Sequence, residues 1–186
     1  RQMCIRDRIM SAIGTRARAA AQTLALASTQ DKDAGLQNAA NALRAAAGDI
    51  IAANQRDLAE AKKQNVGAAR LDRIMLDEAR LEAIACAVEA IIALPDPVGT
   101  VLASWQVPSG LDITRVRVPL GVTGVIYESR PNVTADAAAL CLKAGNAVIL
   151  RGSSEIVHSA QAIHGCFSRA LGAAGLDPDG VQLVPS

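Results

Sequence analysis

The sequence predicts an α/β fold in which N-terminal helices precede a doubly wound, Rossmann-like parallel sheet. The chain of 186 residues is 51% hydrophobic but only 2% aromatic, and such an aliphatic interior suits helices packed on a parallel sheet. Short apolar runs alternate with helical stretches in its last third, which is the pattern of βαβ units. The final run, VQLVPS, stops just after its proline, so we expect the sheet to be incomplete within these residues.

The beginning of the chain differs in character from the rest of the sequence. Residues 1–9 show no helical or strand period, because charges alternate with isolated apolar residues. We interpret them as a non-native leader and place the native start at Met10. Ser11 is then expected to cap an alanine-rich helix that runs to about Ser28.

Two further helices are predicted before residue 95. From Leu36 to Ala61 the residues of one helix face recur every three or four positions, with a break expected near Gly48 or Asn54. Asp77 is expected to cap the next helix. The buried face of that helix should carry Leu81, Ile84, Val88 and Ile91.

After Pro97 the hydrophobic period changes from helix to strand. Residues 101–107 and 111–118 are β-rich runs, and the Pro-Ser-Gly sequence at 108–110 is a turn signal between them. The charges that alternate along these runs indicate an exposed hairpin, or an arm that contacts another subunit.

The rest of the chain predicts a β-α-β-α-β order. The strands are residues 122–127, 146–150 and 181–184. Asn132 is expected to cap the first connecting helix, which Gly145 ends, and Ser154 to cap the second, which reaches about Leu171. Such units pair in parallel, and ligands bind beyond the carboxyl ends of the strands. The two loops at those ends are Glu128–Asn132 and Arg151–Glu155.

The loop at 151–155 lacks the GxGxxG fingerprint of dinucleotide sites. It still offers the Arg151 guanidinium and the hydroxyls of Ser153 and Ser154 to a phosphate, with Gly152 where the backbone can approach a ligand. The alternative is a structural turn followed by a capped helix.

The loop at 128–132 is polar and charged. Glu128 and Arg130 either pair with each other or with neighbours, or hold charged groups of a substrate. Asn132 is either an N-cap or an amide donor to an oxyanion.

Composition excludes several classes of function. A net charge of +1 gives no basic footprint for nucleic acid or an anionic membrane surface. The cysteines form no CxxC pair and only two histidines are present, so no metal site is predicted. Cys86, Cys141 and Cys166 are expected to be reduced and buried. Without a signal peptide or a membrane-length apolar run, a cytoplasmic protein is expected.

One continuous stretch carries a family resemblance. The run PLGVTGVIYESRPNVTADAAALCLKAGNAVILRGSSE at 119–155 resembles the γ-glutamyl phosphate reductase family of the aldehyde dehydrogenase superfamily, and the similarity extends over 10–186. It implies an aldehyde-dehydrogenase-like fold of which less than half is present. The implied reaction is the NADPH-dependent reduction of γ-glutamyl phosphate to glutamate 5-semialdehyde with release of phosphate, the second step of proline biosynthesis from glutamate.

The resemblance also implies roles for individual residues. Asn132 matches the asparagine of the superfamily's oxyanion hole. Arg151 stands where the superfamily has a lysine that binds the adenosine ribose, and it suits the 2′-phosphate of NADP. Gly152 replaces a usual proline, and Glu155 lies one residue beyond the superfamily's glutamate. None of the cysteines matches the nucleophile, which is expected beyond Ser186.

The resemblance divides the chain into parts with different expected tasks. Residues 1–9 are the leader, 10–107 the N-terminal helices and the start of the cofactor domain, 108–118 an oligomerisation arm, and 119–186 the Rossmann-like part. Implied partners are γ-glutamyl phosphate, further copies of the chain and glutamate 5-kinase. Two alternatives remain open: another aldehyde-dehydrogenase-like oxidoreductase, or a non-catalytic nucleotide-binding or assembly module.

Overall fold

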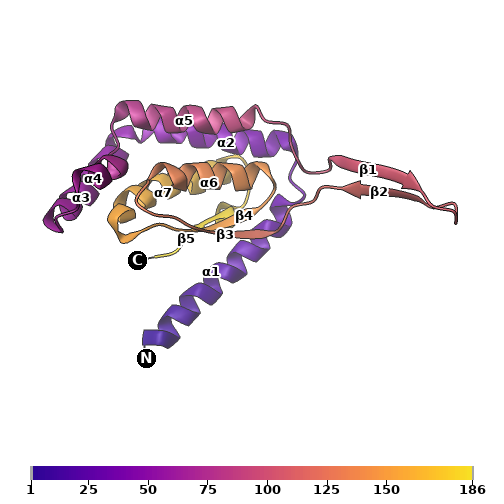
Figure 1. Cartoon of the computed structure of the whole chain (residues 1–186), viewed down its shortest axis with the longest axis horizontal. Coiled ribbons are helices and arrows are strands. Elements are labelled where there is room, and N and C mark those ends of the chain that lie inside the picture. The colour runs from indigo at the N-terminus through magenta and orange to yellow at the C-terminus, as the bar shows by residue number, and fades with distance from the viewer. Residues whose placement is uncertain (1, 186) are drawn as a thin grey trace.

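The computed structural model describes the backbone of residues 2–185 and the side chains of residues 5 and 7–185. In this part of the chain, five helices precede the first strand (Figure 1). They are α1 (Gln2–Leu24), α2 (Thr29–Ala45), α3 (Ala47–Lys63), α4 (Ala68–Ile74) and α5 (Glu78–Ile92). None of the described helices combines the length and apolar character needed to cross a membrane.

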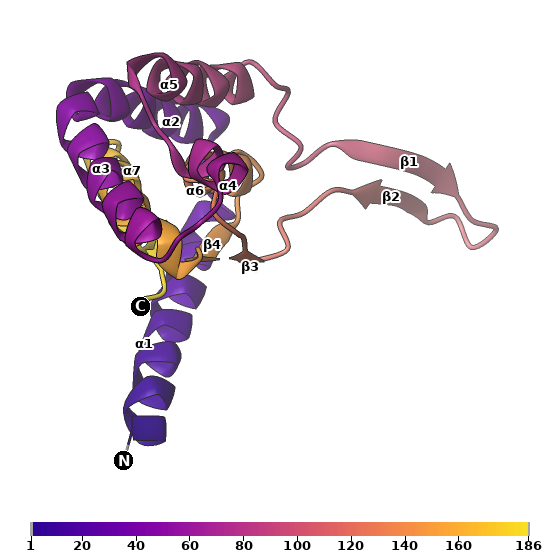
Figure 2. The same cartoon turned by 60° about the vertical axis from the view of Figure 1, so that its left-hand side comes forward.

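A two-stranded hairpin projects from the body of the molecule (Figures 1 and 2). Strand β1 (Val101–Gln106) pairs antiparallel with β2 (Asp112–Val116), and Gly110 takes a φ of 86° in the turn between them. The predicted hairpin is therefore observed. Its first strand lies before residue 108, so the expected boundary between 107 and 108 passes through the hairpin.

The C-terminal third forms a parallel sheet in the predicted β-α-β-α-β order. Its strands are β3 (Val122–Ile126), β4 (Ala147–Arg151) and β5 (Val181–Leu183), paired in that sequence. The connecting helices are α6 (Asn132–Lys143) and α7 (Val157–Ala173). Both lie on one face of the sheet, and α1 crosses the other face (Figure 1). Helices thus cover both faces, as predicted.

A continuous aliphatic core lies where α2, α5, α6 and α7 meet above the sheet. Phe167 of α7 is fully buried there, beside leucines of α2 and α6 such as Leu43 and Leu142. The predicted inner face of α5 is confirmed. All four of its residues are buried: Leu81, Ile84, Val88 and Ile91.

The N-terminal helix begins earlier than predicted. Residues 2–9 continue α1 without interruption, so Ser11 lies inside the helix and caps nothing. Gln, Met, Arg and Ile favour a helix even where no amphipathic period is present, which explains the error. Ser28 instead caps α2, in a capping box with Asp31.

The other predicted boundaries are near the observed ones. The long helical stretch breaks at Ala46, two residues before Gly48 and well before Asn54. Asp77 caps α5 by accepting a hydrogen bond from Arg80 N at 2.7 Å. Gly145 follows the end of α6 with a φ of 72°, a left-handed conformation that glycine adopts without strain.

Two predicted caps are wrong. Pro131, not Asn132, occupies the N-cap position of α6, and it has no capping side chain. Ser153, not Ser154, accepts the capping bond from Glu155 N, at 3.4 Å, and a 3₁₀ turn (Ser154–Ile156) intervenes before α7. Proline at the start of α6 leaves the Asn132 side chain free for another partner.

Candidate functional site

The two predicted loops lie side by side because β3 and β4 are neighbours in the sheet. Tyr127 N donates to Arg151 O at 3.1 Å, which extends the pairing beyond the strands. The hydroxyl of Ser129 donates to the carboxylate of Glu155. A side chain of each loop is therefore bound to the other loop.

Glu155 is occupied by contacts within the protein. Besides Ser129, it pairs with Arg70 of α4, whose Nε lies 3.0 Å from the Glu155 carboxylate. Only 12% of the Glu155 side chain is exposed. Glu155 therefore links both loops to α4.

Little room is left for a side chain at Gly152. A Cβ atom there would lie 3.3 Å from the Tyr127 ring and 3.2 Å from Ile156, closer than ordinary van der Waals contact. The Tyr127 hydroxyl bonds Thr134 Oγ1 of α6 at 2.7 Å, and burial raises the pKa of Tyr127.

A small groove lies beyond the ends of β4 and β5, against the start of α7. Of the predicted phosphate-binding residues, Arg151, Gly152 and Ser153 line it. Ser154 is exposed and does not line this groove. Within the described residues the Arg151 guanidinium has no hydrogen-bond or acidic partner, so it remains free for a phosphate.

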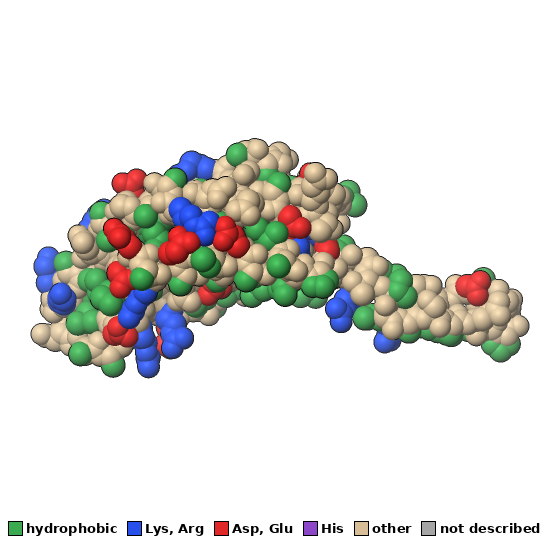
Figure 3. All heavy atoms as spheres, turned by 90° about the horizontal axis from the view of Figure 1, so that it is seen from above, with side chains coloured by type: hydrophobic (Ala, Val, Ile, Leu, Met, Phe, Trp, Pro, Cys, Tyr) green, Lys and Arg blue, Asp and Glu red, His purple; other side chains and the backbone are tan. Residues whose placement is uncertain are grey.

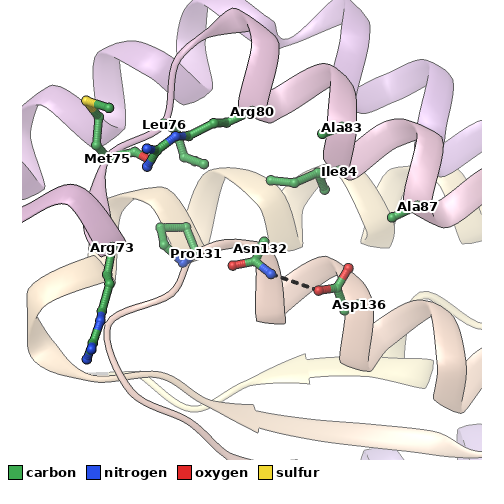
Figure 4. Close-up of a pocket in the computed structure, with 10 residues that line it drawn as sticks. All are labelled: Arg73, Met75, Leu76, Arg80, Ala83, Ile84, Ala87, Pro131, Asn132 and Asp136. Carbon is green, nitrogen blue, oxygen red and sulfur yellow. Dashed lines mark hydrogen bonds between the residues drawn. The ribbon is translucent and has the colours of Figure 1, made fainter. Parts of the chain in front are cut away.

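A larger cavity, of about 300 Å³, lies on the other side of the 128–132 loop (Figure 4). Asn132 and Asp136 of α6 form one wall with Pro131. The opposite wall comes from the end of α4, from the segment between α4 and α5, and from α5 itself. Its residues are Arg73, Met75, Leu76, Arg80, Ala83, Ile84 and Ala87.

Asn132 is bound to a carboxylate within this cavity. Its Nδ2 donates to Asp136 Oδ2 at 2.9 Å, one helical turn along α6. Burial raises the pKa of Asp136, and the bond from Asn132 partly offsets that effect. An amide has two N–H donors, so the second remains available to a ligand.

Hydrogen bonds hold the opposite wall in place. Arg80 donates to the main-chain oxygens of Asp72 and Met75, at 2.5 and 3.1 Å, and to Asp72 Oδ1 at 2.6 Å. The guanidinium of Arg80 therefore closes the turn between α4 and α5. Arg73 is exposed, and its side chain extends away from Asp136 (Figure 4).

A buried polar network connects this wall to the start of α7. Asn54 of α3 donates to Ile74 O at 2.8 Å and to Ser159 Oγ at 3.0 Å, and it accepts from Leu76 N at 2.8 Å. Asp57 accepts from Ser159 N, at 2.8 Å, and from the Ser159 hydroxyl. Helix α3 thereby positions both the wall of the large cavity and the start of α7, which lines the groove.

Glu128 and Arg130 are exposed, and neither lines the large cavity. Within the described residues their side chains form no ion pair with each other. A main-chain hydrogen bond joins Arg130 N to Glu128 O at 2.9 Å. Their substrate role stays a prediction from sequence.

The described cysteines have no features of an activated nucleophile. Cys166 is buried as predicted, but Cys141 is only half-buried and Cys86 is exposed, because Cys86 lies on the outer face of α5 beside Glu82. Its hydrogen bond to Glu82 raises the pKa of that thiol, and burial raises the pKa of Cys141 and of Cys166. A reactive cysteine needs the opposite shift. The side chain of Cys4 lies outside the described residues.

Sequence reasoning missed the residues that surround Asn132. Asp136 follows it by four positions, a spacing that puts both on one helix face, and this signal was present in the sequence. Arg70 and Asn54 gave no such signal, because their partners are far along the chain. Over the part of the chain that the structure describes, no three His, Cys, Asp or Glu side chains converge as metal ligands would.

Comparison with known proteins agrees with the geometry. A γ-glutamyl phosphate reductase of Brucella anthropi is 58% identical over 177 residues, covering 95% of this chain and 42% of that protein. The crystal structure of γ-glutamyl phosphate reductase from Thermotoga maritima matches with a TM-score of 0.91 at 36% identity, over 95% of this chain and 42% of that one. The crystal structure of the Saccharomyces cerevisiae γ-glutamyl phosphate reductase matches with a TM-score of 0.88 at 32% identity. The match covers 94% of this chain and 45% of that one.

The chain therefore spans about 42% of the length of the curated relatives that it matches. The structural matches confirm the aldehyde-dehydrogenase-like α/β fold. The profile of the aldehyde dehydrogenase family matches residues 4–186, nearly the whole sequence. This chain belongs to the aldehyde dehydrogenase family.

Proposed function

We propose that the whole protein reduces γ-glutamyl phosphate to glutamate 5-semialdehyde with NADPH, releasing phosphate, as the second step of proline biosynthesis from glutamate. One observation carries the proposal: 58% identity over 177 residues to a γ-glutamyl phosphate reductase. The cavity beside Asn132 and the groove beside Arg151 support it, because they lie at the carboxyl ends of adjacent parallel strands, where α/β folds bind ligands.

Asn132 is the proposed oxyanion donor. One N–H of its amide is fixed by Asp136 at 2.9 Å, which leaves the other for the oxygen of the reacting carbonyl. Losing a donor of this kind costs roughly 3–4 kcal/mol of transition-state stabilisation. The acyl group would be carried by a cysteine thiolate. We place that cysteine outside these 186 residues, as the family resemblance implies, and the raised pKa values of Cys86, Cys141 and Cys166 are consistent with that placement.

Arg151 and Ser153 are the residues that would hold NADPH, which supplies the hydride. The Arg151 guanidinium is half-buried and unpaired among described side chains, and it suits the ribose 2′-phosphate. Ser153 lines the same groove. Gly152 lines the groove as well, and its main chain would approach the cofactor there. Glu155 is bound to Arg70, so it is not proposed as a direct cofactor ligand.

The hairpin is proposed as an assembly arm. All residues of both strands are exposed, including Trp105 at 46% and Ile113 at 37%, and exposed apolar strands of this kind seek a partner. We propose further copies of the same chain as that partner. A cytoplasmic location and association with glutamate 5-kinase, which supplies the acyl phosphate, complete the proposal.

The test is an assay of the full-length protein for reduction of NADP with glutamate 5-semialdehyde, with and without inorganic phosphate. Activity that depends on phosphate, and is lost when a cysteine beyond residue 186 is replaced, is expected. Oxidation of other aldehydes without activity on this one would leave the family assignment intact and overturn the substrate. Residues 1–186 alone are expected to show no turnover.

A further inference from the structure

The large cavity contains a carboxylate that no cation neutralises among the described residues. Asp136 is half-buried on the α6 wall, and its only hydrogen-bond partner in that part of the chain is the neutral amide of Asn132. The remaining lining is apolar apart from Arg73 and Arg80. An ionised carboxylate in such surroundings is costly unless a positive group approaches it.

The two arginines of the cavity do not supply that positive group. The Arg80 guanidinium donates its hydrogen bonds to Asp72 and to the carbonyl oxygen of Met75. Arg73 extends away from Asp136, and no ion pair joins the two among described residues (Figure 4). One oxygen of Asp136 accepts from Asn132, so the other is free to accept from a ligand.

We propose that Asp136 binds the α-ammonium group of an amino-acid substrate and thereby selects α-amino acids over their desamino analogues. This inference rests on the proposed function, and it assigns the recognition of the amino group to α6 in place of the loop residues Glu128 and Arg130.

The spacing along α6 fits such a ligand. The Asn132 amide nitrogen lies 2.9 Å from Asp136 Oδ2, so two ligand groups that bond to these side chains, each about 3 Å away, can lie up to roughly 9 Å apart. In glutamate 5-semialdehyde, four bonds separate the carbonyl carbon from the amino nitrogen, a span of at most about 5 Å. A substrate whose carbonyl oxygen meets the Asn132 amide can therefore also reach Asp136 with its ammonium group. The apolar side chains of Leu76 and Ile84 line the cavity opposite and suit its methylene groups.

The test compares two aldehydes with the full-length protein: glutamate 5-semialdehyde, and 5-oxopentanoate, which has the same chain without the amino group. In Asp136→Asn the acceptor to Asn132 is kept and the charge is removed. We expect kcat/KM for the semialdehyde to fall about 10- to 100-fold, as for loss of a charged hydrogen bond. The value for 5-oxopentanoate should change by less than about threefold.

Two further variants make the outcome unambiguous. Asp136→Glu, which keeps the charge, should recover part of the preference, and Asp49→Asn, a matched change at an exposed acid of α3, should leave it unaltered. An equal loss for both aldehydes would overturn the proposal, because it would show that Asp136 acts only by orienting Asn132. An unchanged preference would overturn it as well.

Calorimetric titration with L-glutamate and with glutarate separates this inference from the proposed reaction. Wild-type protein should bind L-glutamate more tightly, and Asp136→Asn should bind the two acids alike. If wild-type protein failed to oxidise the semialdehyde, the proposed reaction would be wrong. The difference in affinity between L-glutamate and glutarate would still test the role of Asp136. Equal binding of both acids by wild-type protein would refute that role.

Discussion

At the scale of single residues, the structure separates side chains that face a ligand from those that hold the loops. Arg151, Ser153, Asn132 and Asp136 line the groove or the cavity. Glu155 lies near Arg151 in sequence, yet its carboxylate is bound to Arg70 at 3.0 Å. Neighbouring positions in one loop therefore have different tasks.

The free guanidinium of Arg151 leads to a prediction about cofactor choice. Arg151→Ala should weaken NADPH binding by about tenfold or more, because a charged hydrogen bond to the 2′-phosphate is lost. NADH has no such phosphate and should bind nearly as before. Dissociation constants of both cofactors, measured by fluorescence titration of the full-length protein, check this. Equal weakening of NADPH and NADH binding would show that Arg151 contacts a group that both cofactors contain, and not the 2′-phosphate.

The packing of Gly152 leads to a second prediction at this scale. Gly152→Ala should destabilise the protein by about 1–3 kcal/mol, because the new methyl group would crowd the Tyr127 ring at 3.3 Å. Urea unfolding measures the difference. Gly48→Ala is the matched control, since nothing lies within 4 Å of a Cβ there. If both variants lost the same free energy of unfolding, crowding of the Tyr127 ring would not be the cause.

At the scale of elements, α3 acts through Asn54, which joins the segment before α5 to α7. Asn54→Ala would leave Ile74 O and Leu76 N without their partners, both at 2.8 Å. Buried groups left unsatisfied cost about 1–3 kcal/mol each, so we expect a loss of roughly 2–5 kcal/mol in the free energy of unfolding. Gln55→Ala, at an exposed position of the same helix, should change it by less than about 0.5 kcal/mol.

The contact between α2 and α5 should respond to acid. Arg44 bonds Glu89 at 2.5 Å and Glu82 at 2.8 Å, and the bond from Arg44 lowers the pKa of Glu89 from 4.5 to about 2. Because the pKa of Glu89 is lower in the folded than in the unfolded protein, this ion pair stabilises the fold above pH 4.5. Its contribution is lost as the pH falls from 4.5 toward 2. Thermal unfolding of Glu89→Gln should therefore depend less on pH over that window than unfolding of the wild type does. Identical pH profiles would contradict this.

The features that could be predicted from sequence depend on local signals. The buried face of α5, the stop at Gly145 and the hairpin turn each depend on residues close together in the chain, and all three are observed. The partners of Asn54 lie 20 to 105 residues away, and Arg70 lies far from Glu155. Such contacts exist only after the helices have packed, so no local pattern could indicate them. Asp136 was the exception, because its helical spacing from Asn132 was visible.

At the scale of the whole molecule, two kinds of surface stand apart. Charged side chains of both signs are interspersed over the helical body, whereas hydrophobic side chains run along one edge of the projecting hairpin and charged ones lie near its base and its tip (Figure 3). Every residue of strands β1 and β2 is exposed, yet the two strands carry the large apolar side chains of Trp105, Ile113 and Val116. A hairpin of two strands is marginal alone, so this one should gain its stability from a contact with another subunit.

This contact is predicted to hold the assembly together. In the full-length protein, Trp105→Ser combined with Ile113→Ser should lower the subunit number, because the two side chains are cross-strand partners and lose their apolar area together. Light scattering after gel filtration gives the mass of the assembly. The circular dichroism of the dissociated subunit should stay helical, since neither residue belongs to the core around Phe167. The exposed pair Ser104→Ala and Thr114→Ala, on the same two strands, should leave the mass unchanged. An intact assembly in the Trp105 and Ile113 variant would place the subunit contact on another surface.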